Sequence, residues 1–124
     1  MAYTAIVFDQ NSRSRVLQQA RAMGMLAGMD KMHCHHVTLA MGDQSARFKV
    51  GEKRTVRATH YGWTSGRVCA FLVAGAGDSD NSKPHVTVAT NSAAGAKPRE
   101  SNDIIGWVPL AVSFELTGEI EVCK

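Results

Sequence analysis

A five-residue segment occurs twice in this chain, and it restricts the possible folds more than any other feature of the sequence. Residues 36–40 read HVTLA and residues 85–89 read HVTVA, so four positions are identical and the fifth exchanges Leu for Val. Side chains alternate between the two faces of a β-strand, so each copy would separate its histidine and threonine from its aliphatic residues. The repeat therefore predicts two strands, each with one polar face and one buried face.

The rest of the chain predicts a mixture of helix and strand. Residues 3–8 are β-branched and aromatic, which is typical of a short buried strand, and the polar residues that follow would cap a helix. Apolar side chains recur at helical spacing from Arg13 to about Leu26 and predict that helix. Residues 53–63 alternate and residues 67–75 are mostly apolar, with a turn signal between them, so together they predict a hairpin.

Two polar loops and an extended C-terminal region complete the expected organisation. Residues 75–83 and 91–103 are rich in turn-forming residues, and residues 104–122 predict one or two strands. No low-complexity tract or linker divides the chain, and 124 residues suffice for one hydrophobic core. The sequence therefore predicts a single domain over residues 1–124.

The composition is that of an ordinary globular protein. Hydrophobic residues make up 44% of the sequence and charged residues 20%, and the net charge of +3 weakly favours an anionic ligand. Three cysteines without metal-type spacing indicate free thiols and a reducing compartment. The apolar stretch near the N-terminus is too short for a signal core or a membrane span, so we expect a cytoplasmic protein with no membrane partner.

The polar faces of the two repeats carry groups suited to acid–base catalysis. His36 and Thr38 would project from one strand face, as His85 and Thr87 would in the second copy. Imidazole titrates with a pKa of about 6.5, so one histidine can accept a proton while the other donates one. Threonine hydroxyls can donate hydrogen bonds to phosphoryl oxygens as negative charge develops there. Facing each other, the four residues would form a cleft that cleaves phosphodiesters without a metal or other cofactor.

With H-x-T-x motifs at residues 36–39 and 85–88, the chain resembles the 2H phosphoesterase superfamily. That superfamily includes 2′-5′ RNA ligase-like proteins, cyclic nucleotide phosphodiesterases, cyclic phosphodiesterase domains of tRNA ligases, and phage enzymes that destroy cyclic oligonucleotide signals. The resemblance spans the chain and implies a compact bilobal α+β fold, with mainly antiparallel sheets around a central cleft and a helix after the first strand. Only one clear helix can be read here, so the second lobe would be reduced.

The histidine cluster before the first motif allows a different interpretation. Cys34 and His36 would share a strand face, and thiolate and imidazole are good zinc ligands. Neighbours on one strand rarely close a tetrahedral site, however, and no CxxC or HExxH pattern occurs. We therefore predict no metal site, and we expect His33 and His35, on the opposite face, to be structural or solvent-facing.

Two further pairs of residues are candidates for substrate binding. Tyr61 and Trp63 would share a strand face near basic residues, where aromatic rings can stack on nucleobases. Hairpin aromatics also commonly pack across strands, which is the simpler role for this pair. Lys97 and Arg99 lie in the loop after the second motif, which could fold over the cleft, although loop charges are often merely solvated.

Two functions from different classes follow from these residues. The first is a metal-independent phosphodiesterase acting on a 2′,3′-cyclic phosphate, a 2′-5′ linkage or a cyclic oligonucleotide. The second is a non-catalytic module that binds RNA or a nucleotide in the same cleft. Two complete His/Thr pairs favour the enzyme, because binding alone needs positive charge more than two titrating imidazoles. In either case the expected partner is a nucleotide, a cyclic oligonucleotide or an RNA end.

Overall fold

Seven β-strands and one α-helix make up most of the fold, as described by a computed structural model for residues 2–124. In chain order the elements are β1 (Tyr3–Phe8), α1 (Gln10–Ala22), β2 (Lys31–Met32), β3 (His36–Met41), β4 (Lys53–Thr64), β5 (Val68–Ala74), β6 (His85–Thr90), the 3₁₀ helices η1 (Ser92–Ala94) and η2 (Pro98–Asp103), and β7 (Val108–Cys123). The hairpin predicted from residues 53–63 and 67–75 is confirmed, because these segments form β4 and β5, which pair antiparallel.

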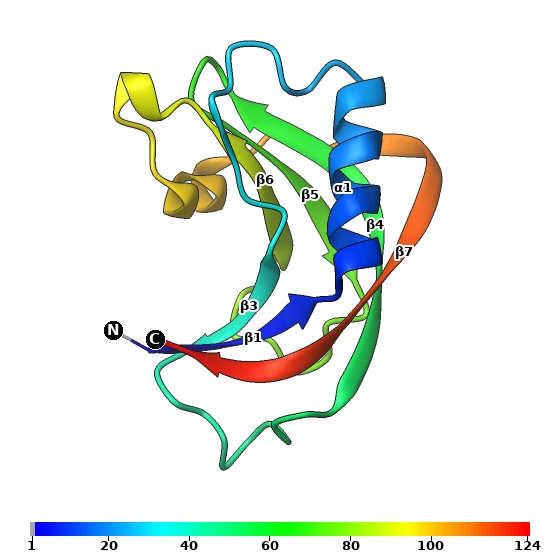
Figure 1. Cartoon of the computed structure of the whole chain (residues 1–124), viewed down its shortest axis with the longest axis vertical. Helices are drawn as coiled ribbons and strands as arrows, with labels where there is room; N and C mark the ends of the chain where they lie inside the picture. The colour runs from blue at the N-terminus through cyan, green and yellow to red at the C-terminus, as the bar shows by residue number, and fades with distance from the viewer. Residues whose placement is uncertain (1) are drawn as a thin grey trace.

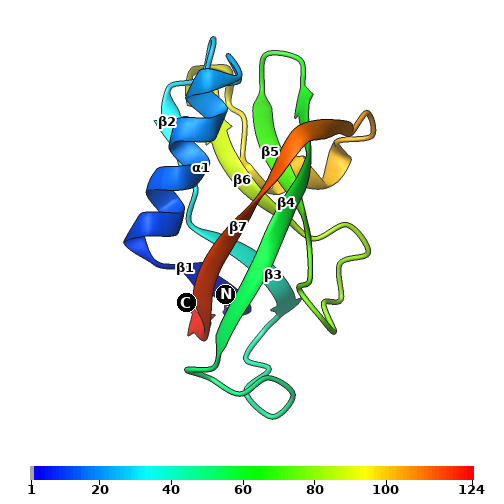
Figure 2. The same cartoon turned by 90° about the vertical axis from the view of Figure 1, so that its right-hand side faces the viewer.

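Six of the strands form a closed antiparallel barrel (Figure 1). Their order around the barrel is β6, β3, β1, β7, β4 and β5, and the pairing of β5 with β6 completes the ring. The short strand β2 pairs with β6, the strand that also pairs with β3. Figure 2 shows β4 and β7 side by side along the length of the molecule. Closure gives each strand of the ring a partner on both sides, which protects its backbone hydrogen-bonding groups.

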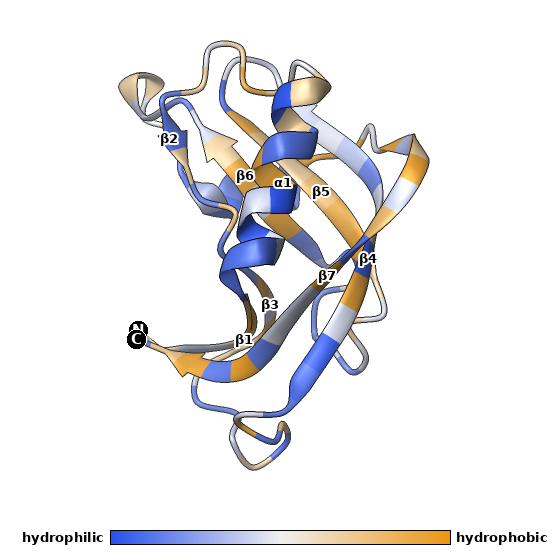
Figure 3. Ribbon diagram, turned by 45° about the vertical axis from the view of Figure 1, so that its right-hand side comes forward, coloured by the Kyte–Doolittle hydropathy of each residue, from blue (hydrophilic) through white to orange (hydrophobic). Residues whose placement is uncertain are grey.

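The barrel interior is filled by aliphatic and aromatic side chains. β5 is apolar along its length (Figure 3), and Phe71 at its centre is fully buried and meets the ring of Phe114 edge to face at 5.2 Å. On β3 and β6, Val37 and Val86 are fully buried in the same core. Because strand side chains alternate, the histidines and threonines beside these valines face outward from the barrel.

Helix α1 packs against β1, β6 and β7, and its buried residues Val16 and Ala20 join the barrel core. The carboxylate of Asp9 accepts a hydrogen bond from the backbone N–H of Ser12 at 2.8 Å and so caps the first turn. The helix ends earlier than the predicted Leu26, because Gly24 adopts a φ of 72° and the chain leaves the helical path. Among residues 2–124, no helix has the length and apolar character required to cross a bilayer.

The predicted bilobal α+β architecture is wrong. The two strands that carry the H-x-T-x motifs are neighbours in one closed barrel, rather than parts of two lobes around a central cleft. The described residues contain a single α-helix, which cannot cover the apolar faces of two open sheets. Instead, one sheet closes on itself and buries its apolar side chains inside the barrel.

Candidate functional site

The two H-x-T-x motifs lie on neighbouring antiparallel strands. β3 and β6 pair at Val37 and Val86, the residues that separate histidine from threonine in each motif. This register places the histidine of each motif beside the threonine of the other. The two valines are fully buried, whereas the four polar side chains are partly exposed on the outer face. The motifs are therefore related by a local, approximate twofold axis through the valine pair.

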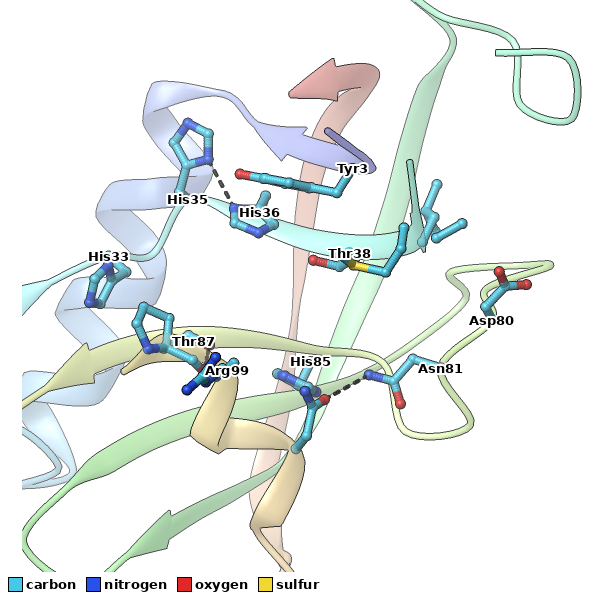
Figure 4. Close-up of a pocket in the computed structure, with 15 residues that line it drawn as sticks. Tyr3, His33, His35, His36, Thr38, Asp80, Asn81, His85, Thr87 and Arg99 are labelled. Atoms are coloured by element: carbon cyan, nitrogen blue, oxygen red, sulfur yellow. Dashed lines mark hydrogen bonds between the residues drawn. The ribbon is translucent and has the colours of Figure 1, made fainter. Parts of the chain in front are cut away.

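A cavity of about 670 Å³ opens over this strand pair (Figure 4). His36, Thr38, His85 and Thr87 all line it, together with residues of β1, the loop before β6, and η2. The structure thus brings together the four residues that the sequence predicts to be catalytic. The volume lies within the range of small-molecule sites in proteins, which is about 300–1,000 Å³.

The backbone conformation of Cys34 directs the histidines on either side of it toward the cavity. Cys34 is the one residue other than glycine, within residues 2–124, with a positive φ, at 56°. Its side chain is buried, with Sγ 3.5 Å from the carbonyl oxygen of Val88, while His33, His35 and His36 all line the cavity. The prediction that His33 and His35 face away from His36 is therefore wrong, because the regular strand begins only at His36.

The backbone conformation of Cys34 also removes the geometric argument for a zinc site at Cys34 and His36. Cys34 points into the core and His36 into the cavity, so they do not share a strand face. Across residues 2–124, no three His, Cys, Asp or Glu side chains are grouped so that they could hold a metal ion.

His36 is held between an aromatic ring and a second imidazole. Its ring centroid lies 4.9 Å from that of Tyr3, and its Nδ1 lies 3.1 Å from Nδ1 of His35 (Figure 4). Burial, reinforced by the neighbouring histidines and by Arg13, lowers the pKa of His36 to about 4. In the free protein at neutral pH, the imidazole of His36 is therefore uncharged.

His85 is oriented by a backbone carbonyl. Its Nδ1 lies 2.9 Å from the carbonyl oxygen of Lys83, which can only accept, so Nδ1 carries a proton. Burial lowers the pKa of His85, and the Lys83 carbonyl opposes this shift because it stabilises the imidazolium. The second nitrogen, Nε2, can therefore accept a proton when the ring is neutral and donate one when it is charged.

The two threonines differ in their hydrogen bonds. Thr87 Oγ1 lies 2.8 Å from Ser101 Oγ and 3.3 Å from the carbonyl oxygen of Pro98, so its hydroxyl proton is directed toward η2. The hydroxyl of Thr38 has no such partner in the part of the chain that the structure describes, although its carbonyl oxygen accepts from Ser79 at 3.5 Å. Thr38 can therefore donate to a bound oxyanion without breaking an existing bond.

Arg99 brings a permanent positive charge to the cavity. It lies on η2, so of the two alternatives for this loop, the one in which it folds against the site is observed for Arg99. Lys97, the other candidate cation of this loop, is not among the lining residues. Asp80 is the one carboxylate among the described lining residues, and Arg47 pairs with it at 3.0 Å. The cavity is consequently suited to an anionic ligand.

Tyr61 and Trp63 lie away from this cavity. Their rings stack at 5.6 Å, so they do share a strand face, and they line a separate cavity of about 440 Å³ with Met23, Met25 and Met29. The structure therefore does not place them beside the two motif histidines.

Several lining residues are not marked by any pattern in the sequence. The side-chain amides of Asn81 and Asn102 are hydrogen-bonded at 3.3 Å between the loop before β6 and η2, and the ring of Tyr3 on β1 contacts that of His36 at a tilt of 34°. Their positions depend on strand pairing and loop docking, for which the sequence contains no periodic signal. His35 is conspicuous in the sequence, but its contact with His36 is not predictable there, because Cys34 breaks the expected alternation.

The comparisons with known proteins bear on the fold alone. No protein family model and no curated protein matches the sequence. The structure is similar to the crystal structure of TT0787 of Thermus thermophilus, with a TM-score of 0.52, covering 93% of this chain and 83% of that chain. The two sequences are 12% identical, so this likeness indicates a common architecture and carries no information on activity.

Proposed function

We propose that this chain is a metal-independent phosphodiesterase that hydrolyses a nucleotide phosphodiester by acid–base catalysis with two histidines. The observation that carries the proposal is that His36, Thr38, His85 and Thr87 line one cavity from two directly paired strands. The two H-x-T-x motifs resemble those of 2H phosphoesterases, and we extend that resemblance to the chemistry while leaving out the bilobal fold.

A phosphodiester in the cavity would meet groups that match each stage of its hydrolysis. One imidazole removes a proton from the attacking water or hydroxyl as the new P–O bond forms, and the other protonates the leaving oxygen as the old bond breaks. Thr38 and Arg99 line the same cavity, and in this proposal they stabilise the negative charge on the phosphoryl oxygens. The substrate anion also raises the depressed pKa values of both histidines, because a nearby negative charge favours the imidazolium.

We propose three substrate classes: nucleotides with a 2′,3′-cyclic phosphate, 2′-5′ linked oligonucleotides, and cyclic oligonucleotide signals of the kind that phage enzymes destroy. The cavity is large enough for any one nucleotide unit of these molecules. We place the protein in the cytoplasm of the producing cell, or of the host cell if it is viral. The unpaired thiols of Cys34, Cys69 and Cys123 support a reducing compartment.

The test is hydrolysis of a panel of these substrates in the presence of EDTA. We expect turnover of at least one class, and a loss of about 100- to 10,000-fold in kcat/KM for His36→Ala and for His85→Ala. The double variant should lose little more than either single variant, because the two residues act in one step. His60→Ala, a change on β4 outside the cavity, is the matched control and should retain full activity.

Near-normal turnover by either single variant would contradict the proposal. The non-catalytic binding module would then replace it if calorimetry still shows nucleotide binding that weakens in Arg99→Ala. An activity that disappears with EDTA and returns with added metal would also contradict it.

A further inference from the structure

The side chain of His36 lies within hydrogen-bond distance of His35, a residue that the proposed chemistry does not use. The Nδ1 atoms of His35 and His36 lie 3.1 Å apart, and the two rings meet edge to face at 78° with centroids 5.2 Å apart. Two lone pairs would repel at this distance, and two N–H groups would clash, so one proton lies between the two nitrogens. The tautomers of the two imidazoles are therefore linked.

The direction of this hydrogen bond decides what His36 can do. If His36 donates from Nδ1, its Nε2 keeps a lone pair and can accept a proton. If His35 donates instead, neutral His36 carries its proton on Nε2 and cannot act as a base. A general base at position 36 thus requires an acceptor at position 35.

We propose that His35 is a positioning residue that accepts the Nδ1 proton of His36, which makes His36 the general base of the site and leaves His85 as the general acid. The catalytic part of this inference rests on the proposed function. His35 is only half-buried, so water can solvate its own Nε2–H in this arrangement. His85 suits the acid role because the Lys83 carbonyl holds the proton on Nδ1, so the proton to be donated is carried by Nε2. The same carbonyl partly offsets the lowering of the His85 pKa by burial.

The arrangement also stabilises the charged state of His36 that forms during the reaction. When His36 accepts a proton at Nε2, its Nδ1–H bond to His35 becomes charge-assisted and therefore stronger. Neutral His35 can provide this bond without adding a second positive charge beside His36. Its role matches that of the carboxylate in a catalytic triad, with a neutral acceptor in place of an anion.

Protonation of His35 would switch the site off at low pH. Charged His35 carries a proton on Nδ1, which forces His36 into the tautomer that cannot accept a proton. The charged and titratable groups facing the pair are Arg13, Glu121, His33 and His85, and the ring of Tyr3 contacts that of His36. Burial and Arg13 lower the pKa of His35, whereas Glu121 raises it, so this switch acts below the pKa of free imidazole.

The decisive measurement is the tautomer of His36, read from two-bond ¹⁵N–¹H correlation spectra of the full chain at neutral pH. Wild type and His35→Gln should both show a proton on His36 Nδ1, because the glutamine amide oxygen can accept it. His35→Leu, of similar volume but without an acceptor, should lose this preference. His60→Gln, outside the cavity, should leave the spectrum of His36 unchanged. An unprotonated Nδ1 in wild type, or an unchanged tautomer in His35→Leu, would overturn the inference.

Kinetics provide the second measurement, on the best substrate from the panel. We expect His35→Leu to lose about 10- to 100-fold in kcat/KM, the loss seen when the partner that orients a metal-bound imidazole is removed. His35→Gln should recover most of this loss, and its acid limb should lie at lower pH because glutamine does not titrate. Equal losses in both variants would contradict the positioning role. If wild type cleaves no phosphodiester, the proposed function fails, and the tautomer measurement still decides the His35–His36 bond independently.

Discussion

Individual side chains make the two halves of the site chemically different, even though the motifs are nearly identical. His36 has an imidazole at its Nδ1, whereas His85 has a backbone carbonyl. Thr87 is hydrogen-bonded to η2, whereas the hydroxyl of Thr38 is available to a ligand. The local twofold relation of β3 and β6 therefore does not extend to the surroundings, and each residue should respond differently to substitution.

Replacement of each threonine by valine, which keeps the shape and removes the hydroxyl, should reveal this difference. Thr38→Val should lower kcat by about 100- to 1,000-fold, because a donor to the phosphoryl oxygens is lost. Thr87→Val should lower kcat less, and should destabilise the fold by about 1 kcal/mol, because Ser101 loses its partner. Steady-state kinetics and urea unfolding measure the two effects. Equal losses of kcat in the two variants would contradict this prediction. They would show that the hydrogen bonds of Thr38 and Thr87 in the free protein do not determine which hydroxyl donates to the phosphoryl oxygens.

At the scale of elements, the barrel depends on a close approach between β1 and β7. Gly118 pairs with Phe8, and a Cβ built at Gly118 would lie 2.7 Å from the carbonyl carbon of Val7 and 3.0 Å from Ile6 Cγ2. Real Cβ atoms do not approach backbone this closely, so a side chain here would push the strands apart. β1 also pairs with β3, and the strain would therefore reach the strand that carries His36.

Gly118→Ala should consequently destabilise the protein by about 1–3 kcal/mol, the usual cost of overpacking a filled site. Gly106→Ala is the matched control, because a Cβ there meets no atom within 4 Å, and it should change stability by less than about 0.5 kcal/mol. Urea unfolding followed by circular dichroism compares the two variants. A Gly118→Ala protein as stable as Gly106→Ala would mean that β1 and β7 can separate without cost.

At the scale of the whole molecule, the buried histidines connect the stability of the fold to pH. The folded protein keeps His36 neutral down to about pH 4, whereas the unfolded chain protonates it near its ordinary pKa of about 6.5. Between these values the unfolded state binds more protons, so stability falls as the pH falls through this window. Above about pH 6.5, the contribution of His36 to the stability of the fold is fully present. The lowered pKa values of His33, His35 and His85 act in the same direction.

The free energy of unfolding should therefore drop between about pH 7 and about pH 4, with roughly 2–3 kcal/mol of the loss due to His36. Urea unfolding at several pH values measures the slope for wild type and for His36→Asn, which cannot titrate. The variant should show a shallower dependence than wild type. Parallel curves for wild type and His36→Asn would show that His36 is not protected from protonation by the fold.

Alternation and motif spacing were sufficient to select the central residues of the site. Each motif buries its valine and presents its histidine and threonine, which any strand with this pattern must do. The helix after the first strand and the β4–β5 hairpin were also predictable, because capping and turn signals act over a few residues. For Arg99, which lines the cavity, the only indication in the sequence was its place in the loop after the second motif.

The closure of the barrel and the surroundings of each histidine were decided by tertiary structure. Pairing of β5 with β6 joins segments through contacts that no local pattern specifies, and it replaced the expected two lobes with one ring. The left-handed backbone at Cys34, which directs His35 onto His36, is stable because the core encloses the Cys34 side chain. Within the two motif strands, the sequence by itself determined which chemical groups share a face, since that follows from the alternation of side chains along a regular strand. Which of those groups meet, and in which protonation state, was decided by packing, since burial and long-range contacts set both.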